Sequence, residues 1–145
     1  MTVKKDCMAA KKPPKKFEVE FKSKGVVIGD ETKMQSIVMN LIENAIRYSN
    51  NEGEIKVSWT LDEVGGHLSI KDNGIGIEEK HLSRITERFY RIDKGRSRKM
   101  GGTGLGLAIV KYALQAHEAT LEIKSQIGIG SEFICHFPES RSNIK

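Results

Sequence analysis

A run of closely spaced glycines leads directly into an apolar, helix-like segment in the stretch RKMGGTGLGLAIVK, residues 98–111. The glycines within it are Gly101, Gly102, Gly104 and Gly106. Glycine inside structure costs conformational entropy, so this density indicates either a turn or a close approach of the backbone to a ligand. The pattern favours phosphate as that ligand, because the first N–H groups of a helix lack partners and the helix dipole attracts anions. A flexible loop that ends in a helix is the alternative.

Three well-known phosphate-binding motifs do not match this run. A Walker A loop requires Lys and then Ser or Thr after its last glycine, whereas Leu107 and Ala108 follow Gly106. A dinucleotide fingerprint requires G-x-G-x-x-G after a strand, whereas this run reads G-x-G-x-G after a basic segment without a strand pattern. The H-R-D and D-F-G elements of protein kinases do not accompany it. The sequence therefore predicts another kind of phosphate loop.

The size and apolar content of the chain predict one soluble globular domain. With 145 residues, of which 38% are hydrophobic, the chain can form a single core. No apolar run is long enough to span a membrane, and no signal peptide is visible. Cys7 and Cys135 lack C-x-x-C spacing, so we expect free thiols in a reducing compartment rather than a disulfide or a zinc site. A cytoplasmic location follows as the expectation.

The net charge of +5 resides in the N-terminal segment. Residues 1–16 hold six lysines against one acid, while the basic and acidic residues of the remaining chain cancel. This segment is predicted to be a disordered tail or linker, followed by a folded domain at 17–138 and a short tail at 139–145. A second basic cluster at 84–99 lies immediately before the glycines, where it would attract a polyphosphate. A solvated basic loop is the alternative.

Hydrophobic periodicity predicts a mixed fold. Alternating apolar residues indicate strands at 17–21, 55–61, 68–70, 121–123 and 133–137. Helical periodicity occurs at 32–48, at 105–116 and, over a shorter stretch, at 78–85. Glycine-rich connections at 65–66 and 128–130 join successive strands, so a mixed but mostly antiparallel sheet of about five strands is expected. The predicted fold class is α+β, a two-layer α/β sandwich in which helices cover one face of the sheet.

The helix predicted at 32–48 carries polar residues on one narrow arc. At about 100° per residue, Asn40, Asn44 and Arg47 stack opposite the apolar arc of the same helix. Asparagine is costly inside a helix because its side chain competes for backbone hydrogen bonds, so these residues indicate a compensating role. An amide oxygen suits Mg²⁺, which binds one or two protein oxygens together with substrate phosphates. A merely wet helix face is the alternative.

The segment IKDNGIGI, residues 70–77, follows a predicted strand and combines a carboxylate with two glycines. Asp72 continues the inward parity of Leu68 and Ile70. An unpaired buried carboxylate is costly, and the exocyclic amine of a ligand could serve as its partner. A tight turn is the alternative, although a turn alone would not require Gly76.

Five segments together resemble the GHKL family of ATP-binding domains, and within it the catalytic domain of bacterial sensor histidine kinases. The segment NLIENAIRYS resembles the N box, DNGIGI the first glycine box, TERFYRID the F box, GGTGLGLAIV the second glycine box and GIGSEF a final G-[ST]-x-F element. They span Asn40 to Phe133 in the family's order and spacing. The run ERFYRIDKGRSRKMGGTGLGLAIVKYAL looks most like the phosphate-regulon sensor kinases. The resemblance implies the Bergerat fold, with ATP and Mg²⁺ as cofactors.

The resemblance implies roles for individual residues. Asp72 would accept a hydrogen bond from the adenine amino group, and Ser131 would support Asp72 directly or through water. Asn44 would hold Mg²⁺ with Asn40 nearby, and Asn40, Asn44 and Arg91 would form the catalytic set. The other implied nucleotide-binding residues are Arg47, Tyr48, Gly74, Gly76, Ile77, Gly102, Thr103, Gly104, Leu105 and Gly106. The basic loop at 90–100 would form the ATP lid.

Two positions depart from the family pattern. Thr86 stands where most relatives have phenylalanine, so Phe89 would anchor the lid alone. Asn40 stands where the hydrolytic members of the superfamily have a glutamate that activates water. Glu43 is the only nearby carboxylate, and its offset on the helix makes it a poor substitute. ATP hydrolysis by this domain is therefore expected to be slow.

The phosphoacceptor histidine of the family has no counterpart in the sequence. The four histidines lie in contexts unlike the acceptor motif and are expected to be ordinary surface or loop residues; they are His67, His81, His117 and His136. The resemblance therefore implies a protein-histidine kinase fragment that is inactive for autophosphorylation alone. A separate dimerisation domain would supply the histidine, and a response regulator would receive the phosphoryl group. The full-length protein would be an inner-membrane sensor, of which this is a cytoplasmic part.

Two other functions are alternatives. A hydrolytic GHKL ATPase or an anti-sigma serine kinase would use ATP on the same fold. A nucleic-acid-binding module belongs to another class, and it is disfavoured because the predicted sheet lacks an aromatic stacking platform. No contact with nucleic acid, and none between this fragment and a membrane, is expected.

Overall fold

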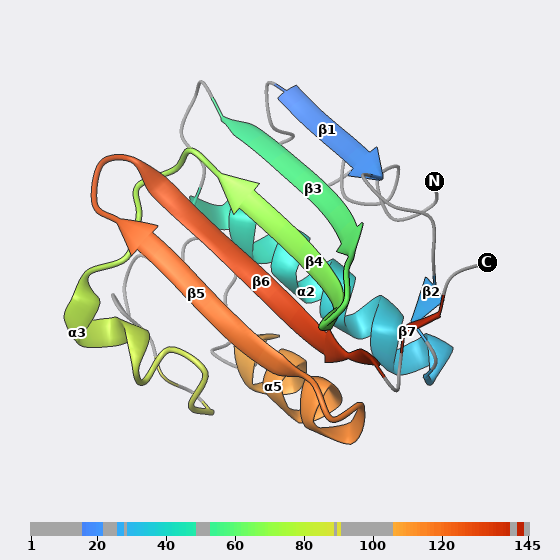
Figure 1. Ribbon diagram of the computed structural model, residues 1–145. Helices are drawn as coiled ribbons and strands as arrows, with labels where there is room; N and C mark the ends of the chain where they lie inside the picture. The colour runs from blue at the N-terminus through green and yellow to red at the C-terminus, as the bar shows by residue number, and fades with distance from the viewer. Residues whose placement is uncertain are drawn as a thin grey trace.

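The computed structural model describes residues 16–21, 26–27, 29–48, 53–88, 90, 106–139 and 142–143. These residues form a five-stranded sheet in the order β1-β3-β4-β6-β5, with helices against one face (Figure 1). The strands of this sheet are β1 Lys16–Phe21, β3 Glu54–Leu61, β4 Gly65–Asp72, β5 Thr120–Gln126 and β6 Gly130–Pro138. All five predicted strands are therefore present.

The sheet is mixed, because β1 pairs with β3 in parallel while the other three pairings are antiparallel. The predicted α+β class and the mostly antiparallel sheet are confirmed. A separate two-stranded ladder joins β2 Val26–Val27 to β7 Ser142–Asn143, and the sequence pattern did not predict it. The division of the chain into a domain and two tails stays a prediction.

Two helices cover one face of the sheet, which we call the helix face (Figure 1). They are α2, Glu31–Tyr48, and α5, Gly106–Ala116, close to the predicted ranges. The third helix, α3, covers only Glu79–Leu82, whereas helix was expected over 78–85. It ends early because Arg84 N–H donates to the His81 carbonyl and Glu87 N–H to the Arg84 carbonyl, which are turn bonds rather than α-helical ones. No helix among the described residues has the length and apolarity needed to cross a bilayer.

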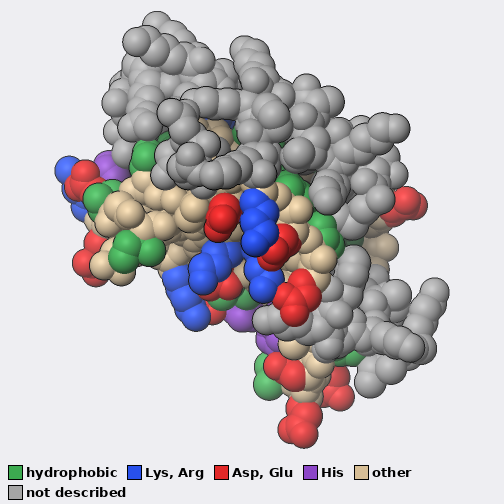
Figure 2. Space-filling model, turned by 90° about the horizontal axis from the view of Figure 1, so that it is seen from above, with side chains coloured by type: hydrophobic (Ala, Val, Ile, Leu, Met, Phe, Trp, Pro, Cys, Tyr) green, Lys and Arg blue, Asp and Glu red, His purple; other side chains and the backbone are tan. Residues whose placement is uncertain are grey.

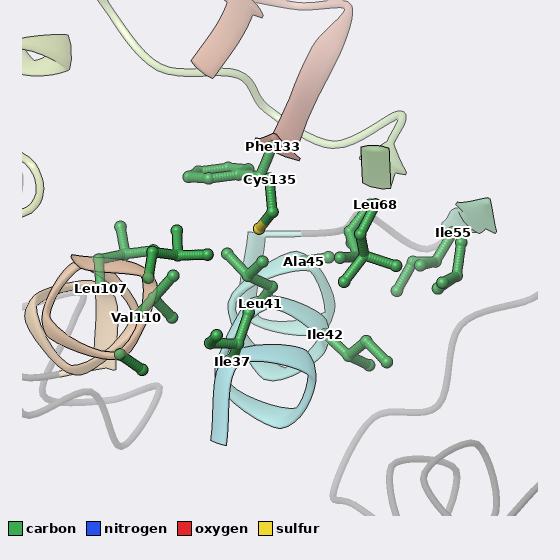
Figure 3. Close-up of a cluster of buried hydrophobic side chains, with 14 of the residues drawn as sticks. Ile37, Leu41, Ile42, Ala45, Ile55, Leu68, Leu107, Val110, Phe133 and Cys135 are labelled. Carbon is green, nitrogen blue, oxygen red and sulfur yellow. The ribbon is translucent and has the colours of Figure 1, made fainter. Parts of the chain in front are cut away.

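The core lies between the helix face and the two long helices (Figure 3). Ile37, Leu41 and Ile42 of α2 are fully buried, and Val110 of α5 points toward them. Phe133 and Cys135 of β6 close the core from the sheet side. Cys135 is a free thiol, as expected, and burial raises its pKa to about 12, so it stays protonated and packs as an apolar group.

The opposite face of the sheet, which we call the open face, is polar. Side chains alternate between the faces along each strand, so Lys71 and Glu132 face outward where Ile70 and Phe133 face the core. Acidic and basic side chains are interleaved here; Lys56, for example, lies 2.7 Å from Glu20. Figure 2 shows blue and red side chains gathered in one such cluster. The open face needs no helix because its polar groups pair with one another.

Candidate functional site

Three polar side chains stand in one row across the helix face. The strand register aligns Asp72 of β4 with Ser131 of β6, and Ser131 with Ser125 of β5. Asp72 is 6% exposed and Ser131 is 7% exposed. Burial raises the pKa of the Asp72 carboxyl, while hydrogen bonds from the backbone N–H groups of Gly74, at 2.9 Å, and Ser131 oppose that rise. The predicted inward parity of Asp72 is correct, and this edge of the core carries a carboxylate.

The loop that follows Asp72 is packed against the C-terminal end of α2. Ile75 N–H donates to the Tyr48 carbonyl at 3.1 Å. A Cβ placed on Gly74 would lie 2.1 Å from the same carbonyl oxygen, so no larger residue fits there without backbone movement. Tyr48 therefore borders this loop, and its predicted contact with the nucleotide base stays a prediction.

The same loop is held on its other side by the β5–β6 hairpin. Gly128 N–H donates to the Ile75 carbonyl at 2.9 Å. Gly76 has φ +77°, and a Cβ there would lie 2.2 Å from the Gln126 carbonyl oxygen. Gly76 is thus required both by its backbone conformation and by close packing. Together with the Tyr48 contacts, these bonds fix the loop between two independent supports.

The polar arc of α2, formed by Asn40, Asn44 and Arg47, is not a fully solvent-exposed helix face. Asn44 is only 7% exposed, and Asn40 and Arg47 are half-buried. Arg47 Nε is buried and has no hydrogen-bond partner within the described part of the chain. Such a donor is costly unless a ligand satisfies it. The alternative of a solvent-exposed face is therefore wrong, and the arc is suited to a polar ligand.

Asn40 connects this arc to the start of α5. Its amide nitrogen donates to the Ser36 carbonyl at 2.7 Å, which leaves the amide oxygen for other contacts. A Cβ on Gly106, the first residue of α5, would lie 3.1 Å from that oxygen. Gly106 therefore allows the N-terminus of α5 to lie close to Asn40 of the polar arc, where its N–H groups could bind an anion.

The site is elongated along α2. Its ends are the loop beside Tyr48 and the N-terminus of α5 beside Asn40. At a rise of about 1.5 Å per residue, these two positions on α2 lie about 12 Å apart. One end presents a buried carboxylate and the other presents amides and a helix terminus. This arrangement suits a ligand with a base at one end and phosphates at the other.

Several predicted site residues lie outside the described residues. They are Arg91, Gly102, Thr103, Gly104 and Leu105, and Phe89 of the expected lid anchor lies there too. The predicted site residues that the structure describes are Asn40, Asn44, Arg47, Tyr48, Asp72, Gly74, Gly76, Ile77, Gly106 and Ser131. Among the described residues, no cluster of three or more His, Cys, Asp or Glu side chains could hold a metal ion.

The expectation of a surface or loop histidine is wrong for His117. This side chain is 2% exposed. Its Nδ1 lies 2.7 Å from the Ala113 carbonyl, and its Nε2 accepts from the Asp30 N–H at 3.0 Å, just before α2. A single neutral tautomer satisfies both bonds. Sequence reasoning missed this role because Asp30 lies 87 residues away along the chain.

Comparison with known proteins places this chain in one family. The family "Histidine kinase-, DNA gyrase B-, and HSP90-like ATPase" matches residues 29–141. The phosphate regulon sensor protein PhoR of Pseudomonas aeruginosa is 55% identical over 109 residues, which cover 75% of this chain and 25% of the relative. PhoR of Haemophilus influenzae is 42% identical over 114 residues, covering 79% of this chain and 27% of the relative. The chain thus spans about a quarter of the length of these relatives.

Solved structures agree with this assignment. The mycobacterial sensor histidine kinase MprB superposes with a TM-score of 0.77 at 30% identity, covering 90% of this chain and 85% of that one. The full-length kinase ShkA, solved in complex with AMPPNP, superposes with a TM-score of 0.73 at 25% identity, covering 89% and 26%. The chain therefore belongs to the histidine kinase-, gyrase B- and HSP90-like ATPase family. Within that family it is an ATP-binding catalytic domain of the two-component sensor histidine kinase type.

Proposed function

We propose that this domain binds Mg·ATP along the polar arc of α2 and presents the γ-phosphate to a histidine on a separate dimerisation domain. The observation that carries the proposal is the buried Asp72 carboxylate, which two backbone N–H groups hold at one end of an elongated site. Asp72 can accept from the amino group of adenine, and it would repel the carbonyl of guanine at the same position. Tyr48, Gly76 and Ile77 would line the base.

The phosphate end would use the polar arc and the start of α5. Arg47 offers a buried N–H that lacks a protein partner among the described residues. The amide of Asn44 would hold Mg²⁺ with Asn40 beside it, and the ion would neutralise charge on the phosphates. From the family pattern, Arg91 and the backbone of 102–106 would complete the phosphate contacts. Each of these roles is a proposal.

The site is arranged for phosphoryl transfer rather than hydrolysis. Asn40 offers an amide where a water-activating carboxylate would be needed, and Glu43 is exposed and offset from Asn40 on α2. His117 is buried and bonded through both ring nitrogens, so it is unsuited to accept a phosphoryl group. We therefore assign the acceptor histidine to another domain of the full-length kinase. On this basis the chain alone is inactive for autophosphorylation.

The whole protein would act in a two-component system. Likeness to PhoR suggests a phosphate-regulon sensor that is anchored in the membrane with its kinase part in the cytoplasm. A response regulator would take the phosphoryl group from the histidine. These statements go beyond this chain, which spans about a quarter of such relatives.

Nucleotide titration followed by phosphotransfer in trans tests the proposal. ATP should bind more tightly with Mg²⁺ than without it, and a dimerisation domain added in trans should become labelled from γ-labelled ATP. Free phosphate should form slowly in its absence. Rapid hydrolysis by the chain alone, or failure to bind ATP, would contradict the proposal.

The variant Asn44→Ala should remove the Mg²⁺ dependence of ATP binding and abolish labelling, while adenosine affinity stays almost unchanged. The physical reason is that only the phosphate end of the ligand depends on the metal. Calorimetry with ATP and adenosine checks this, and Glu43→Ala on the exposed side of α2 is the matched control. Equal losses for ATP and adenosine in Asn44→Ala would show that Asn44 is structural.

A further inference from the structure

Ser125 lies at the centre of a hydrogen-bond network beside the site, although no family motif includes it. Its hydroxyl accepts from the Ile77 N–H at 2.7 Å. The same oxygen lies 2.7 Å from the Ser131 hydroxyl and 3.1 Å from the Gly130 carbonyl. One side chain of β5 thus touches both the loop after Asp72 and the start of β6.

The number of protons on Ser125 limits these bonds. A serine hydroxyl has one hydrogen and two lone pairs. The Ile77 N–H occupies one lone pair, so the hydrogen points either to the Gly130 carbonyl or to Ser131. In the first case Ser131 donates to Ser125 and offers only lone pairs to its other neighbours. In the second case Ser131 keeps its own hydrogen for another partner.

Two of the three partners of Ser125, Ile77 and Ser131, belong to the walls of the candidate site. The Ser131 backbone N–H supports the Asp72 carboxylate, and Ile77 ends the loop that begins at Asp72. The row Asp72, Ser131, Ser125 crosses three adjacent strands on the helix face. A shift of Ser131 or of the loop would therefore move the carboxylate that we assign to the base.

We propose that Ser125 is a positioning residue for adenine recognition: it holds the Ile77 amide and sets the direction of the Ser131 hydroxyl. This inference rests on the proposed function and adds a residue that touches no ligand itself. It predicts a defect confined to the base, because nothing in the network reaches the phosphate end beside Asn40. The signal in the sequence is slight: Ser125 continues the inward parity of Leu121 and Ile123.

Calorimetric titration of Ser125→Ala with adenosine, ADP and ATP tests the proposal. All three affinities should fall by the same factor of about 5 to 20, the effect of losing one or two hydrogen bonds. Ser125→Thr keeps the hydroxyl and should stay within about twofold of the unmodified chain. The matched control is Ser69→Ala on β4, which removes an open-face bond of 2.6 Å to Glu132 and should leave all three affinities unchanged.

A merely structural role would appear differently. Ser125→Ala would then have a lower melting temperature but an unchanged affinity for adenosine. Alternatively, Ser69→Ala or Ser125→Thr would lose as much nucleotide affinity as Ser125→Ala does. Each of these results overturns the proposal. Hydrogen exchange of the Ile77 amide without nucleotide gives an independent readout, expected to be at least about tenfold faster in Ser125→Ala. If the unmodified chain bound no ATP, the proposed function would fail by itself. Unchanged hydrogen exchange of the Ile77 amide in Ser125→Ala would separately show that Ser125 does not hold this amide.

Discussion

The two faces of the sheet shift the pKa of an aspartate carboxyl in opposite directions. Asp72 lies on the helix face, where burial raises the pKa of its carboxyl. Asp62 lies beside the open face, where His67 lowers the pKa of its carboxyl and its Oδ2 is 2.9 Å from His67 Nε2. Burial disfavours the ionised carboxylate at the candidate site despite its backbone hydrogen bonds, whereas the carboxylate outside the site is stabilised by a histidine side chain. On the proposed function, ligand recognition would depend on the carboxylate whose ionised form burial disfavours.

Substitutions that disturb the backbone around Asp72 are expected to have the largest effect on stability. Gly130 has φ +139°, and a Cβ there would lie 2.1 Å from the Asp72 carbonyl oxygen. Gly130→Ala should lower the free energy of unfolding by about 3–5 kcal/mol, because backbone strain and overpacking add together. Urea unfolding measures this change. ATP affinity should fall as well.

Gly128→Ala is the control for Gly130→Ala. Gly128 has φ +83° but open space around its Cβ position, so only the strain of the left-handed backbone remains. A loss of about 1–2 kcal/mol is expected. Equal losses at the two glycines would mean that the close approach to Asp72 does not matter.

Asp72→Asn should weaken ATP binding about 10- to 150-fold and relax the discrimination against GTP, because a hydrogen bond to a charged group is worth about 1.5–3 kcal/mol. Asp62→Asn, on the other side of the sheet, should change ATP affinity less than about twofold. Calorimetry on both variants compares the two carboxylates directly. Comparable losses would remove the functional distinction between the faces.

The same two variants should shift stability in opposite directions when no nucleotide is present. The folded pKa of Asp72 is raised, so its stabilising protonated form is lost as pH rises through that value. Asp72→Asn should therefore be more stable than the unmodified chain at pH 7, and the difference should vanish in acid. The folded pKa of Asp62 is lowered, so its contribution is present at neutral pH and is lost as pH falls through that value. Asp62→Asn should therefore be less stable than the unmodified chain at pH 7. Urea unfolding at several pH values measures both variants, and a change of the same sign in their free energies of unfolding at pH 7 would contradict this prediction.

The smallest effect is expected at a histidine pair on the open face. His67 Nδ1 and His136 Nδ1 lie 2.7 Å apart, and His136 Nε2 lies 2.8 Å from Glu122. The His136 side chain is partly exposed, so these contacts are expected to contribute little to stability. His136→Ala should cost less than about 1 kcal/mol and leave ATP affinity unchanged. Urea unfolding and calorimetry measure these two quantities, and weakened ATP binding in His136→Ala would show that the open face contributes to the site.

Much of the fold could be predicted because its signals are local. The alternation of apolar residues located all five strands of the main sheet, and the shared parity of Asp72 and Ile70 was enough to indicate a buried carboxylate. Contacts between distant segments could not be read in this way. The parallel pairing of β1 with β3, the β2–β7 ladder and the bond from Asp30 to His117 depend on how segments meet in space. Ser125 was missed because a single serine at the end of a strand has no pattern of its own.

We propose above that Asp72 recognises the amino group of adenine. Titration of the unmodified chain with ATP and with inosine triphosphate tests it most directly, because these ligands differ at the base position that carries the amino group in ATP and a carbonyl in inosine triphosphate. We expect inosine triphosphate to bind at least about tenfold more weakly, since a carboxylate can accept from an amino group but not from a carbonyl. Equal affinities for the two nucleotides would contradict the assignment of Asp72.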